Sequence, residues 1–478
     1  MESILLNPGI KMDQKLITTF INDIWDSSII PTLCEYIRIP NKSPAFDPNW
    51  QSHGYMEKAV ELAANWCKQQ AVKDMQLSIH RLPDRTPVLL LDIPGQSDKT
   101  ILLYGHLDKQ PEMTGWDADL DPWKPVIKNN RLYGRGGADD GYAVFAAVTA
   151  IKALQTQNIP HARCVILIET CEESGSYDLP YYVDHLQTEI GTPDLVICLD
   201  SGCGNYEQMW CTTSLRGMVV GELKVEILTE GVHSGSASGI VPSSFRILRQ
   251  LLSRVENENT GEILLEALHT NIPDDRLTQA KAVADTLKDN IWQDFPFVKN
   301  AKPVTQKNLD LVLNHTWKPA LSITGMAGIP PLENAGNVLR PQTTAKLSFR
   351  LPPTCHAEQA GIKIKNILEA NPPYAAKVEF KIQSSTNGWN APVMAKWLEK
   401  AVNKASQDYF NKPALYWGEG GSIPFMGMLG EKFPQAQFVI TGVLGPHSNA
   451  HGPNEFLDLP TAKRITGCIA SIIADHSI

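Results

Sequence analysis

Four short apolar runs recur along the chain without alternating with polar residues. They are TILLY (100–104), CVILI (164–168), LVICL (195–199) and, near the C-terminus, FVI (438–440). Such runs are typical of strands that are buried on both faces of a sheet. Segments with helical spacing of apolar residues lie before and between them, at 13–38, 54–70, 141–154 and 179–186. Strands that alternate with helices predict an α/β fold, with a mostly parallel sheet and helices on both faces.

The middle of the chain has a different pattern. Residues 219–225 and 345–351 alternate apolar with polar positions, which predicts antiparallel strands with one exposed face. Helical stretches near 243–255 and 357–369 accompany them. Because a buried run follows at 438–440, we interpret the middle as a smaller α+β domain inserted into the first. The predicted division is 1–216 with 385–478 for the discontinuous α/β domain, and 217–384 for the insertion.

Length and charge agree with this picture and exclude some classes of function. With 478 residues, the chain exceeds the ~250–300 residues at which a single core stops growing. The formal net charge of −9 and the absence of a Lys/Arg-rich block disfavour a nucleic-acid partner. No run of 18 or more uncharged apolar residues occurs, so no membrane-spanning helix is predicted. The first 15 residues also lack the layout of a signal peptide.

The nine cysteines are scattered and form no CxxC pair. This distribution argues against a zinc ribbon and against a disulfide framework. It favours a reducing compartment, so we expect the protein in the cytoplasm.

Each buried run leads into side chains that can bind a metal. In chain order these candidates are His106 and Asp108, Glu172 with Glu173, Asp200, and His451, and Asp139 with Asp140 come from a further segment (133–140) that opens a helix. Ligands of open α/β sheets bind at the carboxyl ends of the strands. The candidates are therefore expected to converge on one edge of the predicted sheet.

Imidazole nitrogen and carboxylate oxygen suit zinc, cobalt or manganese. One bridging carboxylate would hold two such ions ~3.5–4 Å apart, and binding to a metal ion would lower the pKa of water from ~15.7 towards ~7. Asp108, two residues after His106, points the same way in an extended chain and can fix the imidazole. Of Glu172 and Glu173, one can bind metal while the other transfers a proton.

Each of these signals has an ordinary structural explanation when it stands alone. Asp139 and Asp140 can cap a helix, a Glu-Glu pair is usually a solvated turn, and either His447 or His451 can be a plain loop residue. Their joint occurrence at the ends of buried strands favours a metal site.

Longer motifs narrow the prediction. They are YGHLDKQP (104–111), LYGRG (132–136) before Asp139-Asp140, EESGS (172–176), LRG (215–217), HSG (233–235), EGGSIP (419–424) and HGPNE (451–455). In these motifs and their order the chain resembles the M20 family of metallopeptidases. The likeness is strongest to the carnosinase-like (cytosolic nonspecific dipeptidase-like) branch and spans nearly the whole chain.

The resemblance implies a catalytic domain of the zinc-exopeptidase type that holds two divalent ions, zinc first, with manganese or cobalt as other options. It makes Asp139 the bridging ligand, gives His106 and Asp200 to one metal, and gives Glu173 and His451 to the other. His451 is preferred over His447 because Asn454-Glu455 follows it at the family's spacing. Glu172 would be the general base, and Asp108 would support His106.

The resemblance also implies that the insertion is a lid and dimerisation domain, so that the chain forms a homodimer. His233 would stabilise the oxyanion in the site of the partner subunit. Arg350 would bind the substrate carboxylate, for which a guanidinium fork is well suited. Asn337, Gly421 and Ser422 are further candidates for contacting substrate.

The predicted function is a two-metal hydrolase that cleaves the amide bond of dipeptides or similar small peptides, with a metal-activated water and Glu172 as base. An N-acyl-amino-acid deacylase of the deacetylase, desuccinylase or aminoacylase type is the alternative on the same fold. A non-catalytic binding protein is disfavoured because all five ligands and Glu172 are present. The chain lacks the GxSxG, HExxH and Walker A patterns, which disfavours the corresponding enzyme classes.

Overall fold

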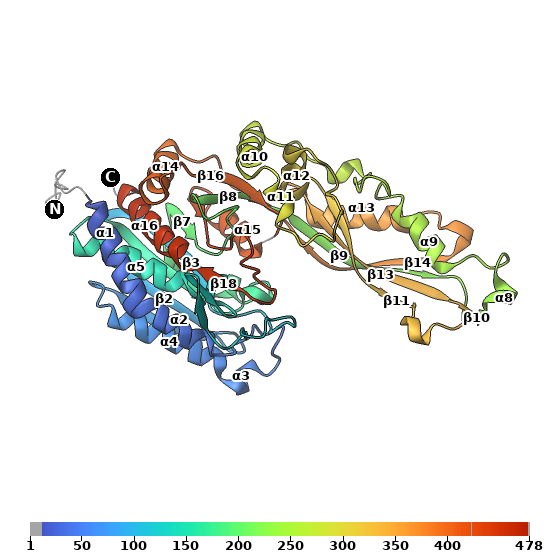
Figure 1. The fold of residues 1–478 in the computed structure, drawn as a ribbon, viewed down its shortest axis with the longest axis horizontal. Helices are drawn as coiled ribbons and strands as arrows, with labels where there is room; N and C mark the ends of the chain where they lie inside the picture. The colour runs from blue at the N-terminus through green and yellow to red at the C-terminus, as the bar shows by residue number, and fades with distance from the viewer. Residues whose placement is uncertain (1–11, 422, 477–478) are drawn as a thin grey trace. The chain divides into compact units, whose positions relative to one another are not determined.

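A computed structural model describes residues 12–421 and 423–476 (Figure 1). Among these residues the chain divides into two compact units. The first unit takes the chain up to Thr212, Ala391–Tyr416 and the segment from Met428 onward. The second unit takes Thr213–Asn390 and Trp417–Gly427.

The first unit is built on a six-stranded sheet of order β1-β2-β6-β3-β7-β17. Strands β6, β3, β7 and β17 run parallel, while β1 and β2 are antiparallel additions at one edge. The sheet is mostly parallel, and the predicted fold class is confirmed. The strands are β1 (Gln76–His80), β2 (Val88–Ile93), β3 (Ser97–His106), β6 (Ala162–Glu169), β7 (Leu195–Cys198) and β17 (Gln437–Ile440).

Both faces of this sheet are buried, which explains the unbroken apolar runs. Leu103, Ile166 and Ile197 belong to the main core of the unit. Leu102 and Val165 point to the opposite face and are also fully buried. Sequence analysis did not predict β1 and β2.

Three helices that pack on one another contribute to this core. Helix α1 (Gln14–Ile24) begins where the Asp13 side chain accepts the backbone N–H groups of Lys15 and Leu16, as an N-cap residue does. Helix α5 (Ala143–Thr156) is almost entirely apolar and buried on all sides. It packs against α1 and α16 (Leu459–His476) (Figure 1). A helix that is apolar all round has to be buried.

Among the described residues, the first unit contains further helices and three short strands. They are η1 (Trp25–Ile29), α2 (Ile30–Ile37), α3 (Trp50–His53), α4 (Tyr55–Gln69), β4 (Val126–Lys128), β5 (Arg131–Tyr133), η2 (Gly137–Gly141), η3 (Glu172–Ser174), α6 (Leu179–His185), α7 (Gln187–Ile190), α14 (Lys396–Phe410) and β18 (Phe456–Asp458).

The second unit is a four-stranded antiparallel sheet of order β11-β13-β9-β14. Helices α9 and α13 cover one face (Figure 1), where Leu223, Phe349 and Ile364 are fully buried. The alternate side chains of β9 are only partly buried, as the period-two pattern predicted. The bounds are β9 (Gly217–Glu226), β11 (Ala320–Ala327), β13 (Gln342–Leu351), β14 (Lys377–Thr386), α9 (Ser244–Leu252) and α13 (Ala357–Glu369).

Three helices of the second unit, and the grouping of one C-terminal segment, had not been expected. The helices are α10 (Asp274–Leu287), α11 (Asn290–Gln293) and α12 (Asn308–Thr316). Trp417–Gly427 groups with this unit, and the backbone N–H of Arg216 bonds to the carbonyls of Glu419 and Gly421. The domain boundaries after 216 and 384 stay a prediction.

Smaller elements complete the described chain. They are β8 (Trp210–Leu215), β10 (Val232–His233), α8 (Ser234–Ala237), η4 (Glu266–Leu268), η5 (Leu332–Asn334), β12 (Val338–Leu339), η6 (Pro373–Ala375), β15 (Trp389–Asn390), β16 (Leu415–Glu419) and α15 (Pro424–Lys432).

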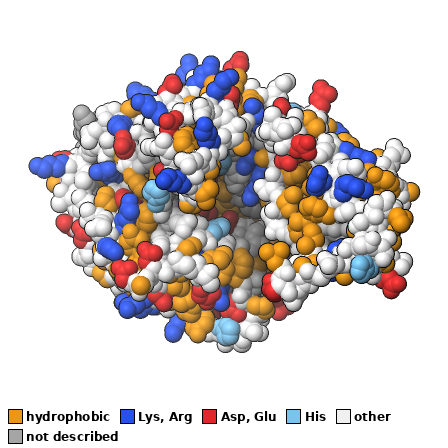
Figure 2. Space-filling view, turned by 45° about the vertical axis from the view of Figure 1, so that its right-hand side comes forward, with side chains coloured by type: hydrophobic (Ala, Val, Ile, Leu, Met, Phe, Trp, Pro, Cys, Tyr) orange, Lys and Arg blue, Asp and Glu red, His pale blue; other side chains and the backbone are white. Residues whose placement is uncertain are grey.

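On the face of the described residues drawn in Figure 2, basic and acidic side chains are interspersed, and neither sign forms an extended patch. Over the described part of the chain, no helix combines the length and the apolar character needed to cross a bilayer.

Candidate metal centre

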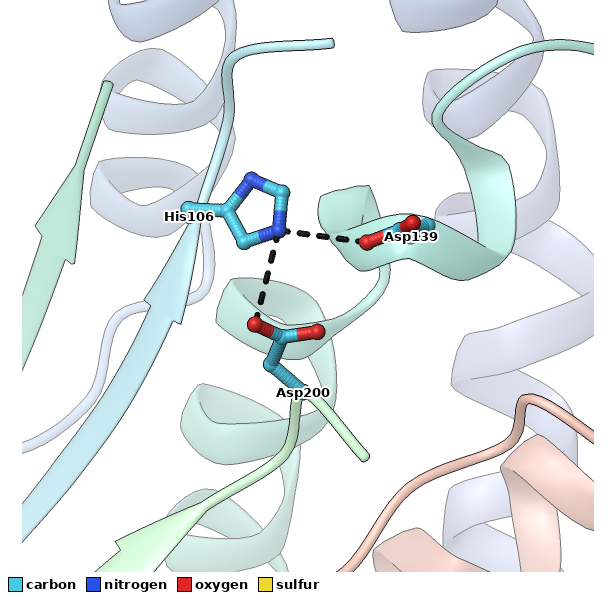
Figure 3. Close-up of side chains that lie close together, drawn as sticks. All are labelled: His106, Asp139 and Asp200. Atoms are coloured by element: carbon cyan, nitrogen blue, oxygen red, sulfur yellow. Dashed lines mark hydrogen bonds and ion pairs between the residues drawn. The ribbon is translucent and has the colours of Figure 1, made fainter. Parts of the chain in front are cut away.

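Strand β3 carries His106 to the carboxyl edge of the first unit's sheet. The pairing of His106 with Glu169 on β6, and of Tyr104 with Cys198 on β7, sets three strand ends side by side. Asp200 follows β7 directly and therefore lies next to His106. The imidazole Nε2 is 3.7 Å from Asp200 Oδ2 (Figure 3). The expected convergence at this edge is observed for these two residues.

Asp139 lies in the turn η2 and faces the same imidazole. Its Oδ1 is 3.3 Å from His106 Nε2, and Figure 3 shows His106, Asp139 and Asp200 pointing toward one another from three separate segments. Their donor atoms lie within 4.8 Å of one another. All three residues are buried, so this group is a compact set of one nitrogen and two carboxylate oxygens.

The other oxygen of Asp139 belongs to a second group of donors. Asp139 Oδ2 is 3.1 Å from His451 Nε2, which is 3.3 Å from Glu173 Oε2. The donor atoms of these three residues also lie within 4.8 Å of one another. Within the described residues the structure thus brings all five predicted ligands into two groups that share one carboxylate. His447 belongs to neither group.

Asp108 contacts both His106 and the turn that carries Glu172 and Glu173. The imidazole Nδ1 of His106 lies 3.1 Å from the backbone carbonyl of Asp108 and 3.4 Å from its carboxylate Oδ1. The same carboxylate accepts the backbone N–H groups of Glu172 at 3.1 Å and Glu173 at 2.9 Å. Asp108 is fully buried, so it orients the imidazole and also fixes the turn that carries the two glutamates.

The charge balance of these groups is negative. Burial raises the pKa of Glu172 well above its ordinary value, and the charge of Asp200 adds to the shift. Burial raises the pKa of Glu173 in the same way, with Asp139 adding to it. Burial works against a charged His106, yet the carboxylates around it raise its pKa well above the ordinary value. Divalent cations would relieve this mutual repulsion.

The donor chemistry fits divalent metals. Glu173 Oε1 and Asp140 Oδ1 are buried and have no hydrogen-bond partner among the described residues, and buried polar atoms are rarely left unsatisfied. A cation bound by Glu173 would satisfy its free oxygen. The mixture of imidazole and carboxylate is that of zinc, cobalt and manganese sites.

Arg350 lies on β13 in the second unit, in a positively charged surrounding. Burial and the charge of Arg350 lower the pKa of the Arg216 guanidinium to about 10. Burial together with both arginines lowers the pKa of His315 to about 4. Among the described residues Arg350 makes no ion pair with an acid, so it is available for an anion.

The other predicted residues of the second unit lie on its surface. His233 ends β10 and is exposed, and the backbone carbonyl of the exposed Asn337 accepts the N–H of Ser234. Gly421 is exposed, and Ser422 lies outside the described residues. The substrate and oxyanion roles of these residues therefore remain predictions.

Glu169 is a buried acid that sequence analysis assigned no role. Its Oε1 accepts the hydroxyl of Tyr104 at 2.6 Å and that of Ser176 at 2.9 Å, while Oε2 has no partner among the described residues. Burial, with a contribution from Asp108, raises the pKa of Glu169 from 4.5 to about 8. The carboxyl is therefore held in its protonated form at neutral pH.

Glu169→Gln is expected to raise the melting temperature at pH 8. The folded state keeps the proton of Glu169 up to about pH 8, whereas the unfolded chain releases it near 4.5. The stabilising contribution of this group is therefore fully present below pH 4.5. The free energy of unfolding then falls as pH rises toward 8, by up to about 1.4 kcal/mol per pH unit. Thermal melts from pH 4 to 9 test this. The variant should match the parent at pH 4, and an equal difference at all pH values would contradict the prediction.

Comparison with known proteins gives one family. The model of the family described as Peptidase family M20/M25/M40 matches residues 102–475, which include every candidate ligand.

Similar proteins and similar solved structures point to the same family. A cysteinylglycine-S-conjugate dipeptidase of Corynebacterium striatum is 28% identical over 406 residues, covering 83% of this chain and 86% of that protein. A Beta-Ala-His dipeptidase of Mus musculus is 27% identical over 369 residues, covering 73% of this chain and 72% of that protein. The solved structure of the dipeptidase Dug1p from Saccharomyces cerevisiae has the same fold, with a TM-score of 0.77, 21% identity, and coverage of 97% and 98%.

Proposed function

Because the chain belongs to peptidase family M20/M25/M40, we propose that it is a metallodipeptidase that hydrolyses the amide bond of dipeptides at a two-metal centre. The observation that carries this proposal is the sharing of Asp139. Its two carboxylate oxygens face two separate donor groups, 3.3 Å from His106 Nε2 and 3.1 Å from His451 Nε2. A bridging carboxylate of this kind is a feature of hydrolytic two-metal sites.

The proposed ligand sets follow the two groups, with zinc as the first choice of metal. His106, Asp139 and Asp200 would hold one ion, and Asp139, Glu173 and His451 the other. When bound, the ions would polarise the scissile carbonyl and make a water nucleophile available at neutral pH. The protein supplies a buried, negatively charged edge on which both sets are held.

Glu172 is the proposed general base. It belongs to neither donor group, and its carboxylate has no hydrogen-bond partner in the described part of the chain. Its backbone is nevertheless fixed by the bond from its N–H to Asp108. The raised pKa of Glu172, caused first by burial, suits a group that takes a proton from water and returns it to the leaving amine.

Further roles carry over from the resemblance as proposals. Arg350 would bind the carboxylate of the substrate, which its lack of an acidic partner supports. His233, Asn337, Gly421 and Ser422 would act on the substrate, with His233 serving the site of the partner subunit in a homodimer. All nine cysteines lie within the described residues as free thiols, which supports a reducing compartment such as the cytoplasm.

Metal analysis combined with a substrate screen tests the proposed function. We expect about two equivalents of divalent metal per chain, turnover of dipeptides, and loss of turnover on chelation with recovery when Zn²⁺, Mn²⁺ or Co²⁺ is returned. N-acetyl and N-succinyl amino acids serve as the comparison substrates. Robust deacylation of these compounds without any dipeptide turnover would contradict the proposal.

The deacylase alternative is not favoured. The similar proteins named above are dipeptidases, and this chain matches 83% and 73% of its length to them. A non-catalytic binding protein is disfavoured as well, because both donor groups and Glu172 are complete.

A further inference from the structure

Glu455 is a buried carboxylate that receives an unusual number of donors. It lies between His451 and β18, and its side chain is 0% exposed. The backbone N–H of Gly136 reaches its two oxygens at 3.0 and 3.1 Å, and those of Ala138 and Asp139 reach Oε1 at 3.3 Å each. The Nη1 of Arg135 donates to Oε2 at 2.7 Å. The carboxylate thus binds the backbone of the loop that ends in Asp139.

Arg135 extends this contact to the other loop. Its Nη2 donates to the backbone carbonyl of Gly452 at 2.6 Å, directly after His451, and its Nε donates to the carbonyl of Pro111 at 3.1 Å. The Arg135 side chain is 1% exposed. Charge-assisted hydrogen bonds of buried groups are short and strong, so Arg135 and Glu455 together connect the two loops.

The two loops need such a connection because the backbone is irregular at both ligands. Asp139 lies in η2, but its φ of −120° and ψ of 88° are not helical. His447, Asn449, His451 and Asn454 all have positive φ, between 54° and 64°. L-residues keep this left-handed conformation only where surrounding contacts hold it. The strand pairing of β18 with β5 begins only after this turn, at Phe456.

The connection joins two ligands of the same donor group. Asp139 and His451 come from segments more than 300 residues apart, yet their donor atoms lie 3.1 Å from each other. Glu455 binds the backbone of the first segment, and through Arg135 it is tied to the backbone next to the second. Neither Arg135 nor Glu455 offers an atom to the metal groups.

We propose that Arg135 and Glu455 are positioning residues that set the separation of Asp139 and His451, and thereby the metal affinity of the group formed by Asp139, Glu173 and His451. This inference rests on the proposed two-metal function. It predicts that the two metal equivalents are affected unequally. In the other donor group, His106 and Asp200 are held by β3 and β7 and not by Arg135 and Glu455.

Glu455→Gln tests the proposal in the full-length chain. The amide keeps one acceptor oxygen but points an NH₂ group at donors, so the loop of Asp139 loses part of its support. Titration of the metal-free protein with Zn²⁺ by calorimetry should show one equivalent weakened by about 10–100-fold and the other weakened much less, because His106 and Asp200 stay fixed on their strands. Excess Zn²⁺ should restore kcat, with KM unchanged. Equal weakening of both equivalents, or no weakening, would overturn the proposal.

Two further variants make the test decisive. Arg135→Lys keeps the charge but loses the fork that reaches Gly452, so it should weaken the same equivalent, and it decides the question if Glu455→Gln does not fold. Glu369→Gln is the matched control, because Glu369 accepts the backbone N–H of Phe380 and the Lys365 ammonium in the second unit. It should leave both equivalents unchanged. A parent protein that binds no metal pair would instead contradict the proposed function.

Discussion

Replacing Asp139 with asparagine is expected to abolish binding of both metal ions and to lower kcat/KM by about 10³-fold or more. The asparagine side chain keeps one carbonyl oxygen but cannot serve two cations with two anionic oxygens. Both donor groups include this residue, so both lose a charged ligand at once. Metal ions in such sites contribute several kcal/mol of transition-state stabilisation, and 4 kcal/mol corresponds to about 10³-fold in rate.

Asp200→Asn provides the graded comparison for Asp139→Asn. Asp200 belongs to one donor group only, so its replacement should weaken one metal equivalent and leave the other. Elemental analysis after dialysis, together with kcat/KM on a dipeptide, measures both effects. If Asp139→Asn retained two tightly bound equivalents, the bridging assignment would be wrong.

Glu172→Gln is expected to lower kcat by about 10²–10⁴-fold, the usual contribution of a general base, while the metal content stays at the parental level. Glutamine has nearly the shape of glutamate but cannot accept a proton. Because Glu172 lies outside both donor groups, the loss should appear in kcat and not in metal binding. The backbone bond from Glu172 to Asp108 is unaffected by the change.

Steady-state kinetics with parallel metal analysis measures this effect. Glu61→Gln, an exposed position on α4, removes one negative charge elsewhere in the first unit and should keep parental kinetics. A Glu172→Gln variant within a few-fold of the parent would rule out the assignment of the base.

Strands β3, β6, β7 and β17 could be predicted because each contains an unbroken apolar run. Strand β2 has a similar run, VLLL (88–91), and was nevertheless missed. The runs TILLY (100–104) and LVICL (195–199) cannot be half-exposed strands, and both lie in strands that are flanked by neighbours on each side in the observed sheet. Strand β1 could not be found in this way, because it has only five residues, QLSIH, none of them fully buried, and so carries only two apolar positions. Helices α10 and α12 were missed because their stripes of apolar residues are weak.

His106, Glu173 and Asp200 could be predicted because they lie at or within four residues of the ends of buried strands, whereas Asp139 and His451 depended on the motifs of the resemblance. His106 and Asp200 needed only the rule that parallel strands present their carboxyl ends at one edge. The part played by the Asp108 carboxylate in holding the backbone of Glu172 and Glu173 leaves no mark in the sequence. Any residue type can supply a backbone N–H group, so hydrogen bonds to the main chain have no sequence pattern. The same reason hid the contacts of Glu455.

The main core of the first unit contains helices from opposite ends of the chain, and this has a consequence for synthesis on the ribosome. Helix α5 is packed by α1 and by α16, and α16 emerges roughly three hundred residues after α5. Until α16 has been synthesised, the apolar face of α5 that packs against it stays exposed. The sheet of the second unit, by contrast, is contained within Gly217–Thr386. Nascent chains therefore expose a long-lived apolar surface, of the kind that aggregates or recruits chaperones, until α16 is made.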